Sequence, residues 1–498
     1  MEQASFDVIV VGGGNAALCA ALSAAENGAR VLVLERAPEA QRGGNSAFTA
    51  GGFRMVHHGI EDVKKLVPDL SEEEIARTDF GEYTEEQYLD DLGRLTQYYI
   101  DPDLAEIIVR RSTETVRWIR DKGIRFVPNY ARYGFKQNGR FKFFGGVVVH
   151  ANGGGRELVE AEYRAAEKHG IAVRYDAQAT ALPRGRSGVE GVRVIADGVE
   201  EEIHAGAVVL ACGGFEANRE WCTRYLGPGW DLAKVRGTRY NTGDGIRMAL
   251  DIGAQSYGQW SGCHAVAWER YAPDFGELDA RTSPYRHSYP FGIMVNADGK
   301  RFVDEGADFR NYTYAKYGRI VLEQPGGYAW QVFDAQVKHV LREEYNLRGA
   351  TKMQADTLEE IVERMQDVNP AQFIATVREY NAAVRRDVPF NPIIKDGRCT
   401  EGLTIPKSNW ANSIEVPPFE AYCVGCGITF TFGGVKIDTT TRVLDTADAP
   451  LRGLYAAGEL VGGLFYFNYP GSAGLMAGSV FGRIAGREAA RFARSTPA

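Results

Sequence analysis

Apolar residues near the start of the chain form two short runs with a helical segment between them. Residues 6–11 read Phe-Asp-Val-Ile-Val-Val, which predicts a short buried strand. Residues 18–27 are predicted to form a helix that Gly28 ends, and residues 30–34 are predicted to form a second strand. This order of strand, helix and strand predicts a Rossmann-like unit in an α/β fold.

The turn between the first strand and the helix is rich in glycine. Residues 12–17 read Gly-Gly-Gly-Asn-Ala-Ala, and Glu35 follows the second strand, 23 residues after Gly12. In a GxGxxA motif, Gly12 permits the tight turn, Gly14 lets a pyrophosphate approach the backbone, and Ala17 lets the helix pack on the strand. The helix N-terminus attracts phosphate, and Glu35 is expected to accept hydrogen bonds from a ribose. The sequence therefore predicts a dinucleotide site, since a glycine turn in another kind of α/β domain would not explain the glutamate.

Three later segments decide which dinucleotide is expected. Residues 42–52 are dense in small residues, which suits a backbone that lies against a flat ring system. Residues 206–214 read as a strand that runs into a glycine turn, and residues 453–459 read as a strand that ends in glycine and an acid. An elongated FAD threaded across one domain would use all of these segments, whereas an NAD site would not. We therefore expect FAD.

The bulk composition argues against several classes of protein. The chain of 498 residues has a formal net charge of −8, which argues against a nucleic-acid partner. Its length predicts two or more structural units. The apolar run from Leu460 to Phe481 is broken by glycines, Asn468 and Pro470, which indicates buried core around a ligand rather than a membrane span. We also expect no signal peptide, because the apolar run of residues 8–11 ends in glycines.

Seven cysteines are spread along the chain, an odd and sparse set that indicates reduced thiols in the cytoplasm. Cys423 and Cys426 form a CxxC. This pair is either a redox pair or half of a zinc site, or it is two small residues in a strand-like segment. No second CxxC or histidine pair accompanies it in the sequence, which favours the strand, and we expect no metal site.

Several motifs are spread along nearly the whole chain, among them the N-terminal GxGxxA, Gly44-Asn45-Ser46, Ala211-Cys212-Gly213-Gly214, Thr242-Gly243-Asp244-Gly245 and Ala457-Gly458-Glu459. In these motifs the sequence resembles the succinate dehydrogenase and fumarate reductase flavoprotein superfamily. A closer match lies in residues 13–22, 42–46, 214–221, 236–241 and 427–432. In those stretches the chain looks most like the tricarballylate dehydrogenases of that superfamily.

The resemblance implies an activity and a domain organisation. The activity is oxidation of a saturated C–C bond beside a carboxyl group. The family fold is an FAD-binding domain made of both chain ends, with a cap domain inserted between them. The segment from Tyr257 to Gly397 lacks glycine motifs of the cofactor type, and residues 356–366 predict a helix with Thr357 as N-cap. We therefore expect an α/β FAD-binding domain over residues 1–256 and 398–498, with an α+β cap over residues 257–397.

The resemblance also implies how FAD is held. Membrane-bound relatives attach FAD through the histidine of a Ser-His-Thr segment, and residues 46–49 here read Ser-Ala-Phe-Thr, so we expect non-covalent FAD. The glycine-rich residues 471–475 lead into a final helix that reaches to about Ala490. Its N-terminus is expected to stabilise the reduced flavin anion, and the alternative is a helix that only fills the core. The residues expected to contact FAD are Gly12, Gly14, Asn15, Ala16, Ala17, Glu35, Arg36, Gly43, Gly44, Asn45, Ser46, Ala50, Gly51, Gly52, Ala179, Ala211, Cys212, Gly213, Asn241, Asp244, Gly458, Glu459, Ser472, Gly474 and Leu475.

The substrate clamp of the fumarate reductases is only partly present. His264 aligns with a histidine that binds a substrate carboxylate in those enzymes. Their histidine before the Gly-Gly pair is replaced within residues 429–431, which read Thr-Phe-Thr, and their proton-donating arginine falls near Lys338. Their arginine after asparagine in the last glycine segment is replaced by Tyr469. Fumarate reduction by the arginine mechanism is therefore not expected.

Aromatic and basic residues are the remaining catalytic candidates. The Tyr-Pro-Gly at Tyr469 resembles the ketosteroid and cyclic-ketone dehydrogenases, in which the tyrosine hydrogen-bonds the ketone oxygen. Tyr466 is a second phenol nearby, and both tyrosines have the alternative role of an aromatic lid on the flavin. Arg310 lies roughly where the family has its proton-relay arginine, and Arg239 lies in a stretch of the closer resemblance. Either arginine could bind a carboxylate or form an ordinary ion pair.

Three functions remain open. The first is an FAD-dependent dehydrogenase of a small carboxylic acid, as in the tricarballylate dehydrogenases. The second is desaturation of a cyclic or steroid ketone, and the third is an FAD-carrying electron-transfer subunit without its own substrate. The sequence contains one GxGxxA and no cysteine series for iron–sulfur clusters, so an external electron acceptor is expected.

Overall fold

The structure is a computed structural model that describes residues 6–137, 139–143, 145–186, 188–278, 284–347 and 349–495. The chain forms two compact units. The first unit contains Met1–Gly227, Arg236–Cys263 and Phe430–Ala498, and the second contains Pro228–Val235 and His264–Thr429. The second unit therefore ends later than residue 397, because the chain leaves it within a long strand, β18 (Phe419–Val435), and no loop marks the boundary.

A sheet with parallel central strands forms the core of the first unit. β1 (Phe6–Val11) pairs in parallel with β2 (Val31–Leu34) on one side and with β12 (Val199–Leu210) on the other. β20 (Pro450–Ala456) pairs in parallel with β12, so a strand from near the C-terminus joins the sheet that the first residues begin. The predicted Rossmann-like unit is confirmed. The remaining strands of this sheet are β9 (Ala172–Arg174), β10 (Ala177–Ala181), β11 (Gly191–Ala196) and β19 (Arg442–Leu444).

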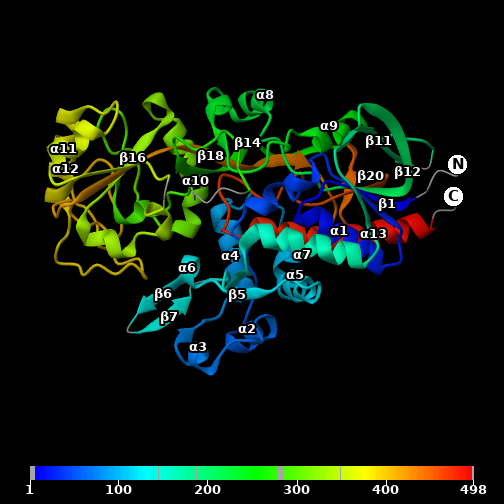
Figure 1. The fold of residues 1–498 in the computed structure, drawn as a ribbon, viewed down its shortest axis with the longest axis horizontal. Coiled ribbons are helices and arrows are strands. Elements are labelled where there is room, and N and C mark those ends of the chain that lie inside the picture. Colours follow the sequence, from blue (N-terminus) through cyan, green and yellow to red (C-terminus); the bar gives the residue numbers. More distant parts are fainter. Residues whose placement is uncertain are drawn as a thin grey trace. The chain divides into compact units, whose positions relative to one another are not determined.

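The first helix and the last helix of the chain pack against each other. These are α1 (Asn15–Glu26) and α13 (Ala473–Ser495), which lie side by side in Figure 1. Gly478, Gly482 and Gly486 recur every four residues on one face of α13. A Cβ atom on Gly482 would lie 2.4 Å from the carbonyl oxygen of Ala16, and one on Gly486 would lie 2.0 Å from that of Ala20. Side chains at these positions would hold the helices apart, so the glycines allow the two chain ends to meet.

Further helices and two small sheets complete the first unit. The prominent helix α7 (Gly154–Lys168) packs on the segment that contains residues 44–48. The other helices are α2 (Ile60–Leu66), α3 (Glu72–Ala76), α4 (Glu85–Leu95), α5 (Pro102–Asp121), α6 (Tyr130–Tyr133), α8 (Arg219–Trp221) and α9 (Asp244–Asp251). One small sheet contains β3 (Gly52–Phe53), β8 (Val149–Ala151) and β5 (Phe126–Pro128). The other contains β4 (Thr78–Asp79), β7 (Arg140–Phe143) and β6 (Gly134–Gln137).

The second unit is built on its own sheet. Its strands are β13 (Lys234–Val235), β15 (Ile293–Val295), β16 (Ala329–Phe333), β17 (Lys352–Ala355) and parts of β14 (Ser256–Glu269) and β18. Its helices are α10 (Tyr314–Leu322), α11 (Leu358–Arg364) and α12 (Pro370–Ala383). Trp330 and Phe373 are fully buried in its apolar core. This mixed composition agrees with the α+β character expected of a cap.

Two sequence expectations can be compared with local structure in the second unit. Thr357 caps α11, because its side chain accepts a hydrogen bond from the Glu360 N–H at 3.1 Å, as predicted. Cys423 and Cys426 are buried residues of strand β18 and are not joined by a disulfide. Across the described residues of both units, no three His, Cys, Asp or Glu side chains are grouped so as to hold a metal ion. No helix among those residues is long and apolar enough to cross a membrane.

Candidate functional site

The glycine turn after β1 has the geometry of a dinucleotide cradle. Gly12 has a φ of +112°, and a Cβ atom there would lie 2.4 Å from the carbonyl oxygen of Ala211. A Cβ atom on Gly13 would lie 2.3 Å from the carboxyl group of Glu35. Gly14 is the N-cap of α1 and has no side chain to cover the first turn. The backbone at the start of α1 therefore leaves room for a phosphate group, which its N–H groups and dipole would attract.

Glu35 lies at the end of β2, where the motif predicts a ribose-binding acid. Its side chain is 6% exposed and accepts a hydrogen bond from the Ala37 N–H at 2.7 Å. Burial raises the pKa of this carboxyl group to about 7, against the effect of nearby backbone donors. Ala179 lies on β10, and this strand is tied to the same corner by a hydrogen bond from the Ala177 N–H to the Glu35 carbonyl oxygen.

FAD affinity should therefore depend on pH near neutrality. A carboxylate accepts hydrogen bonds from two ribose hydroxyls, and protonation removes part of that acceptor capacity. Because the pKa without FAD is about 7, binding should release a proton, and affinity should fall as pH drops below 7. We expect Glu35→Gln to bind FAD more weakly with a flatter pH profile. Fluorescence titration of the apoprotein measures this, and parallel profiles for the two proteins would contradict it.

Residues 42–52 form the next wall of the cradle. Gly43 has a φ of +104° and Gly51 a φ of +70°, conformations that favour glycine. The side chain of Ser46 accepts a hydrogen bond from the Asn15 N–H at 3.1 Å, which joins this loop to the start of α1. A Cβ atom on Gly51 would lie 2.8 Å from the backbone of Gly154 at the start of α7. Gly43, Gly44 and Ser46 thus lie beside Gly14, whereas Gly51 lies against the start of α7.

Two carboxyl groups, the buried Glu216 and the partly buried Glu459, lie together next to the same loop. Glu216 accepts hydrogen bonds from Asn45 Nδ2 at 2.6 Å and Asn241 Nδ2 at 2.7 Å. Asn241 Nδ2 also lies 3.4 Å from Glu459, which accepts from the Thr431 N–H at 2.8 Å. Burial, with the neighbouring carboxyl group, raises the pKa of Glu459 well above its usual range, and burial raises that of Glu216. The pair therefore holds the side chains of two predicted cofactor residues, Asn45 and Asn241, in place.

An ion pair closes the cradle at the start of α9. Arg36 Nη1 lies 2.7 Å from Asp244 Oδ2 and 2.5 Å from the hydroxyl of Thr242. Arg36 follows Glu35 directly, so the contact joins the end of β2 to the segment Thr242-Gly243-Asp244. Cys212 and Gly213 follow β12 at the same place, and a Cβ atom on Gly213 would lie 2.4 Å from Asn241 Nδ2. The residues that the sequence analysis assigned to FAD thus converge within the first unit.

The start of α13 reaches the same cradle from the C-terminal end. Asn15 Nδ2 donates to the Leu475 carbonyl oxygen at 3.2 Å and to Ser479 Oγ at 3.0 Å. Gly458 has a φ of +85°, and a Cβ atom there would lie 2.8 Å from Ala16. The opening glycines and the final helix are therefore adjacent. The starts of α1 and α13 border this cradle, and added Cβ atoms on its glycines would fill it. Such a cradle fits a dinucleotide such as FAD.

The segment before α13 carries a cluster of aromatic rings. Tyr469 is 6% exposed, and its ring lies 5.2 Å from that of Phe430 and 5.3 Å from that of Phe465, both edge to face. A Cβ atom on Gly474 would lie 3.9 Å from both Phe430 and Tyr469, so the rings border the first turn of α13. Tyr466 is partly exposed and contacts Tyr99 instead. Of the two predicted tyrosines, only Tyr469 belongs to this aromatic wall.

The basic candidates differ in their surroundings. Arg239, in the first unit, is exposed. His264, in the second unit, is 1% exposed, and its ring lies 5.0 Å from that of Tyr314, which in turn lies 5.2 Å from the ring of His287. The guanidinium of Arg310 lies over the same Tyr314 ring at 5.5 Å. Two histidines and an arginine therefore surround one tyrosine. Of these four residues, His264 and Arg310 were candidates from the sequence, and His287 and Tyr314 were not.

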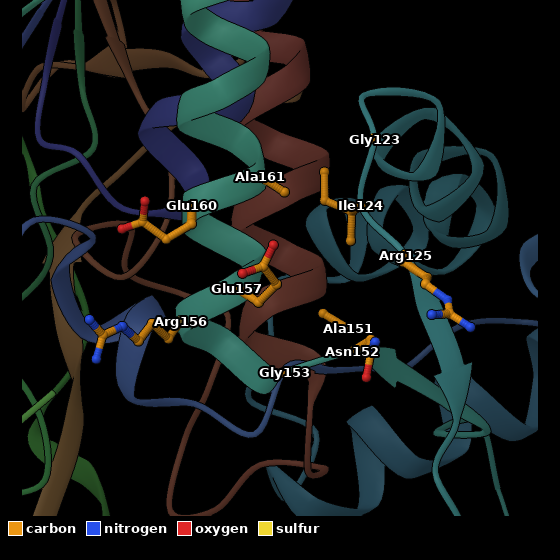
Figure 2. Close-up of a pocket in the computed structure, with 10 residues that line it drawn as sticks. All are labelled: Gly123, Ile124, Arg125, Ala151, Asn152, Gly153, Arg156, Glu157, Glu160 and Ala161. Atoms are coloured by element: carbon orange, nitrogen blue, oxygen red, sulfur yellow. The ribbon is translucent and has the colours of Figure 1, made fainter. Parts of the chain in front are cut away.

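A hollow of about 490 Å³ lies elsewhere in the first unit, at the start of α7 (Figure 2). Figure 2 shows Arg125 on one side of it, with Glu157 and Glu160 on the helix. These charges have partners: Arg125 pairs with Asp69, Glu157 with Arg164, and Glu160 with Arg42. None of the residues assigned to FAD lines this hollow.

Comparison with known proteins gives one family and several relatives. The FAD binding domain family matches residues 7–475. A probable fumarate reductase, Ifc3, from Shewanella frigidimarina is 29% identical over 98% of this chain and 75% of its own length. An NADH:fumarate oxidoreductase from Klebsiella pneumoniae is also 29% identical, and the chain spans about half of it (48%). The open conformation of a flavocytochrome c3 fumarate reductase superposes with a TM-score of 0.74 at 27% identity, over 98% of this chain and 78% of the other.

Proposed function

The chain belongs to the FAD binding domain family, and from this premise we propose that it is a dehydrogenase that desaturates a C–C bond next to a carboxylate or carbonyl group. The bound FAD would accept the hydride at N5. The observation that carries the proposal is Tyr469, a buried phenol in the segment just before α13 and in the same unit as the FAD cradle. It would donate a hydrogen bond to the substrate oxygen on which negative charge develops.

We propose a small carboxylic acid, as in the tricarballylate dehydrogenases, as the first candidate substrate. The cluster of His264, His287 and Arg310 around Tyr314 supports this choice. Arginine binds a carboxylate with two parallel hydrogen bonds, and a protonated histidine adds a further donor. Arg239 stays a candidate for the same role. The base that removes the α-proton is not assigned.

A cyclic or steroid ketone is the second candidate. The surroundings of Tyr469 favour it, because Phe430 and Phe465 form an apolar wall where the fumarate reductases are expected to have a polar clamp. An apolar ring system would pack on this wall, and the Tyr469 hydroxyl would hydrogen-bond the ketone oxygen and favour enolisation. Burial of the ring would favour binding by about 25 cal/mol for each Å² of apolar surface removed from water.

Anaerobic mixing of the oxidised protein with tricarballylate, and separately with a cyclohexanone or a ketosteroid, tests the two candidates. Loss of the flavin's visible colour with tricarballylate supports the acid, and loss with a ketone alone supports the second candidate. If none of these compounds bleaches the flavin, the result would favour a subunit that carries FAD and electrons without a substrate of its own.

The electrons would leave to an external acceptor, which we propose to be a partner protein, a quinone or a dye. The longer NADH:fumarate oxidoreductase is named for a nicotinamide donor, but this chain spans only 48% of it. The single GxGxxA of the sequence is already used by the FAD cradle. The cysteines are sparse and form no disulfide in the part of the chain that the structure describes, which supports a cytoplasmic location.

A further inference from the structure

A buried arginine connects the early part of the first unit to the turn before α13. Arg54 follows β3 and its side chain is completely buried. Its Nε donates to the Gly471 carbonyl oxygen at 2.9 Å, and its own backbone N–H lies 3.4 Å from the Ser472 carbonyl oxygen. One residue therefore binds two consecutive carbonyl groups of the turn that follows Tyr469 and Pro470.

The turn that Arg54 binds is conformationally strained. Ser472 has a φ of +70°, which a residue with a Cβ atom rarely adopts. Such strain persists only where surrounding contacts hold it, and it is common at functional sites. The next residue, Ala473, begins α13, and its N–H donates back to the Pro470 carbonyl oxygen at 3.1 Å. The direction in which α13 starts is thus fixed by a turn whose carbonyl groups are bound by Arg54.

A second set of contacts fixes the guanidinium itself. Arg54 Nη1 donates to the Tyr83 hydroxyl at 2.8 Å and to Asp91 Oδ2 at 3.0 Å, and the Tyr83 hydroxyl donates to the same carboxylate oxygen at 2.6 Å. Arg94 Nη2 donates to the other carboxylate oxygen of Asp91, Oδ1, at 3.2 Å. The planar guanidinium can make these bonds and the bond to Gly471 at once because its donors point in fixed directions.

We propose that Arg54 is a positioning residue that holds the strained Gly471–Ser472 turn, and through it Tyr469 and the first turn of α13, in the orientation that the flavin requires. The inference rests on the proposed roles of Tyr469 and of the α13 N-terminus. In this role Arg54 acts through the turn rather than on the reacting atoms. Tyr83 and Asp91 serve by fixing the guanidinium.

Two variants and one control test this role. Arg54→Lys keeps the positive charge but loses the planar set of guanidinium donors. Tyr83→Phe removes one hydroxyl group and keeps the ring. Tyr88→Phe is the control: Tyr88 is equally buried and its ring lies 5.5 Å from that of Tyr83, but among the described residues its hydroxyl has no hydrogen-bond partner. The readouts are amide hydrogen exchange of residues 468–475 in the apoprotein and the midpoint potential of the bound flavin, neither of which needs a substrate.

We expect exchange at residues 468–475 to become about tenfold faster in Tyr83→Phe and faster still in Arg54→Lys, because each loses a hydrogen bond to a charged group. The flavin potential should fall in both variants, since a misaligned helix N-terminus stabilises the reduced anion less. Tyr88→Phe should match the unaltered protein in both measurements. Unchanged exchange in Tyr83→Phe and Arg54→Lys, or an equal change in Tyr88→Phe, would overturn the proposal. Failure of every candidate substrate would leave these readouts intact and would count only against the proposed reaction.

Discussion

Replacing Gly12 by alanine is expected to leave the purified protein without bound FAD. The new Cβ atom would lie 2.4 Å from the Ala211 carbonyl oxygen, and the residue would have to keep a φ of +112°. Relief of that clash moves the turn that the pyrophosphate must approach. A strain of about 3 kcal/mol weakens binding by on the order of a hundredfold. Visible absorbance of the purified variant and FAD titration of its apoprotein measure the loss.

Gly123→Ala is the matched control for this experiment. Gly123 has a φ of +102°, close to that of Gly12, but a Cβ atom there would meet nothing within 4 Å. This variant carries the backbone strain without the contact, so it should lose about 1 kcal/mol of stability and keep its FAD. If Gly12→Ala retained FAD as well as Gly123→Ala does, the glycine turn would not be the pyrophosphate site.

Replacing Tyr469 by phenylalanine should lower turnover by about 10² to 10³-fold while FAD stays bound, because one hydrogen bond to the developing oxyanion is lost. The ring contacts with Phe430 and Phe465 would remain, so the loop should keep its structure. The measurement is the rate of flavin reduction under anaerobic stopped flow, with whichever substrate bleaches the unaltered protein.

Phenylalanine variants of two further tyrosines, Tyr466 and Tyr88, are the controls for Tyr469→Phe. Tyr466→Phe should have a smaller effect, since Tyr466 contacts Tyr99 outside the aromatic wall. Tyr88→Phe tests whether loss of any buried hydroxyl near the loop slows the reaction. A Tyr469→Phe rate within a few-fold of the unaltered rate would assign this residue to packing and would remove the electrophile from the proposed function.

The parts of the site that local spacing determines could be predicted from the sequence. The turn at Gly12, the helix after it and Glu35 lie within one short segment, and each has a physical role tied to its position in the motif. The strands β12 and β20 were likewise expected from short apolar runs that end in glycine. Local spacing along the chain is therefore enough to predict the glycine turn, Glu35 and the strands of the cradle.

The parts that depend on distant partners could not be predicted in this way. Arg54 and the Gly471 carbonyl group are separated by 417 residues, and no local pattern marks an arginine that will be buried by such a contact. His287 and Tyr314 were missed for the same reason, because only the folded second unit places them beside His264. The four-residue spacing of Gly478, Gly482 and Gly486 was a signal that the sequence did contain, and it indicates the close packing of α13 on α1.

The central claim is that both ends of the chain hold one FAD without a covalent bond. Acid precipitation of the purified protein, followed by measurement of flavin in the supernatant and pellet, tests it most directly. We predict about one FAD per chain in the supernatant and a colourless pellet, because residues 46–49 offer no histidine for attachment. Flavin retained in the pellet would contradict the non-covalent site, and a protein that takes up no flavin on reconstitution would contradict the whole account.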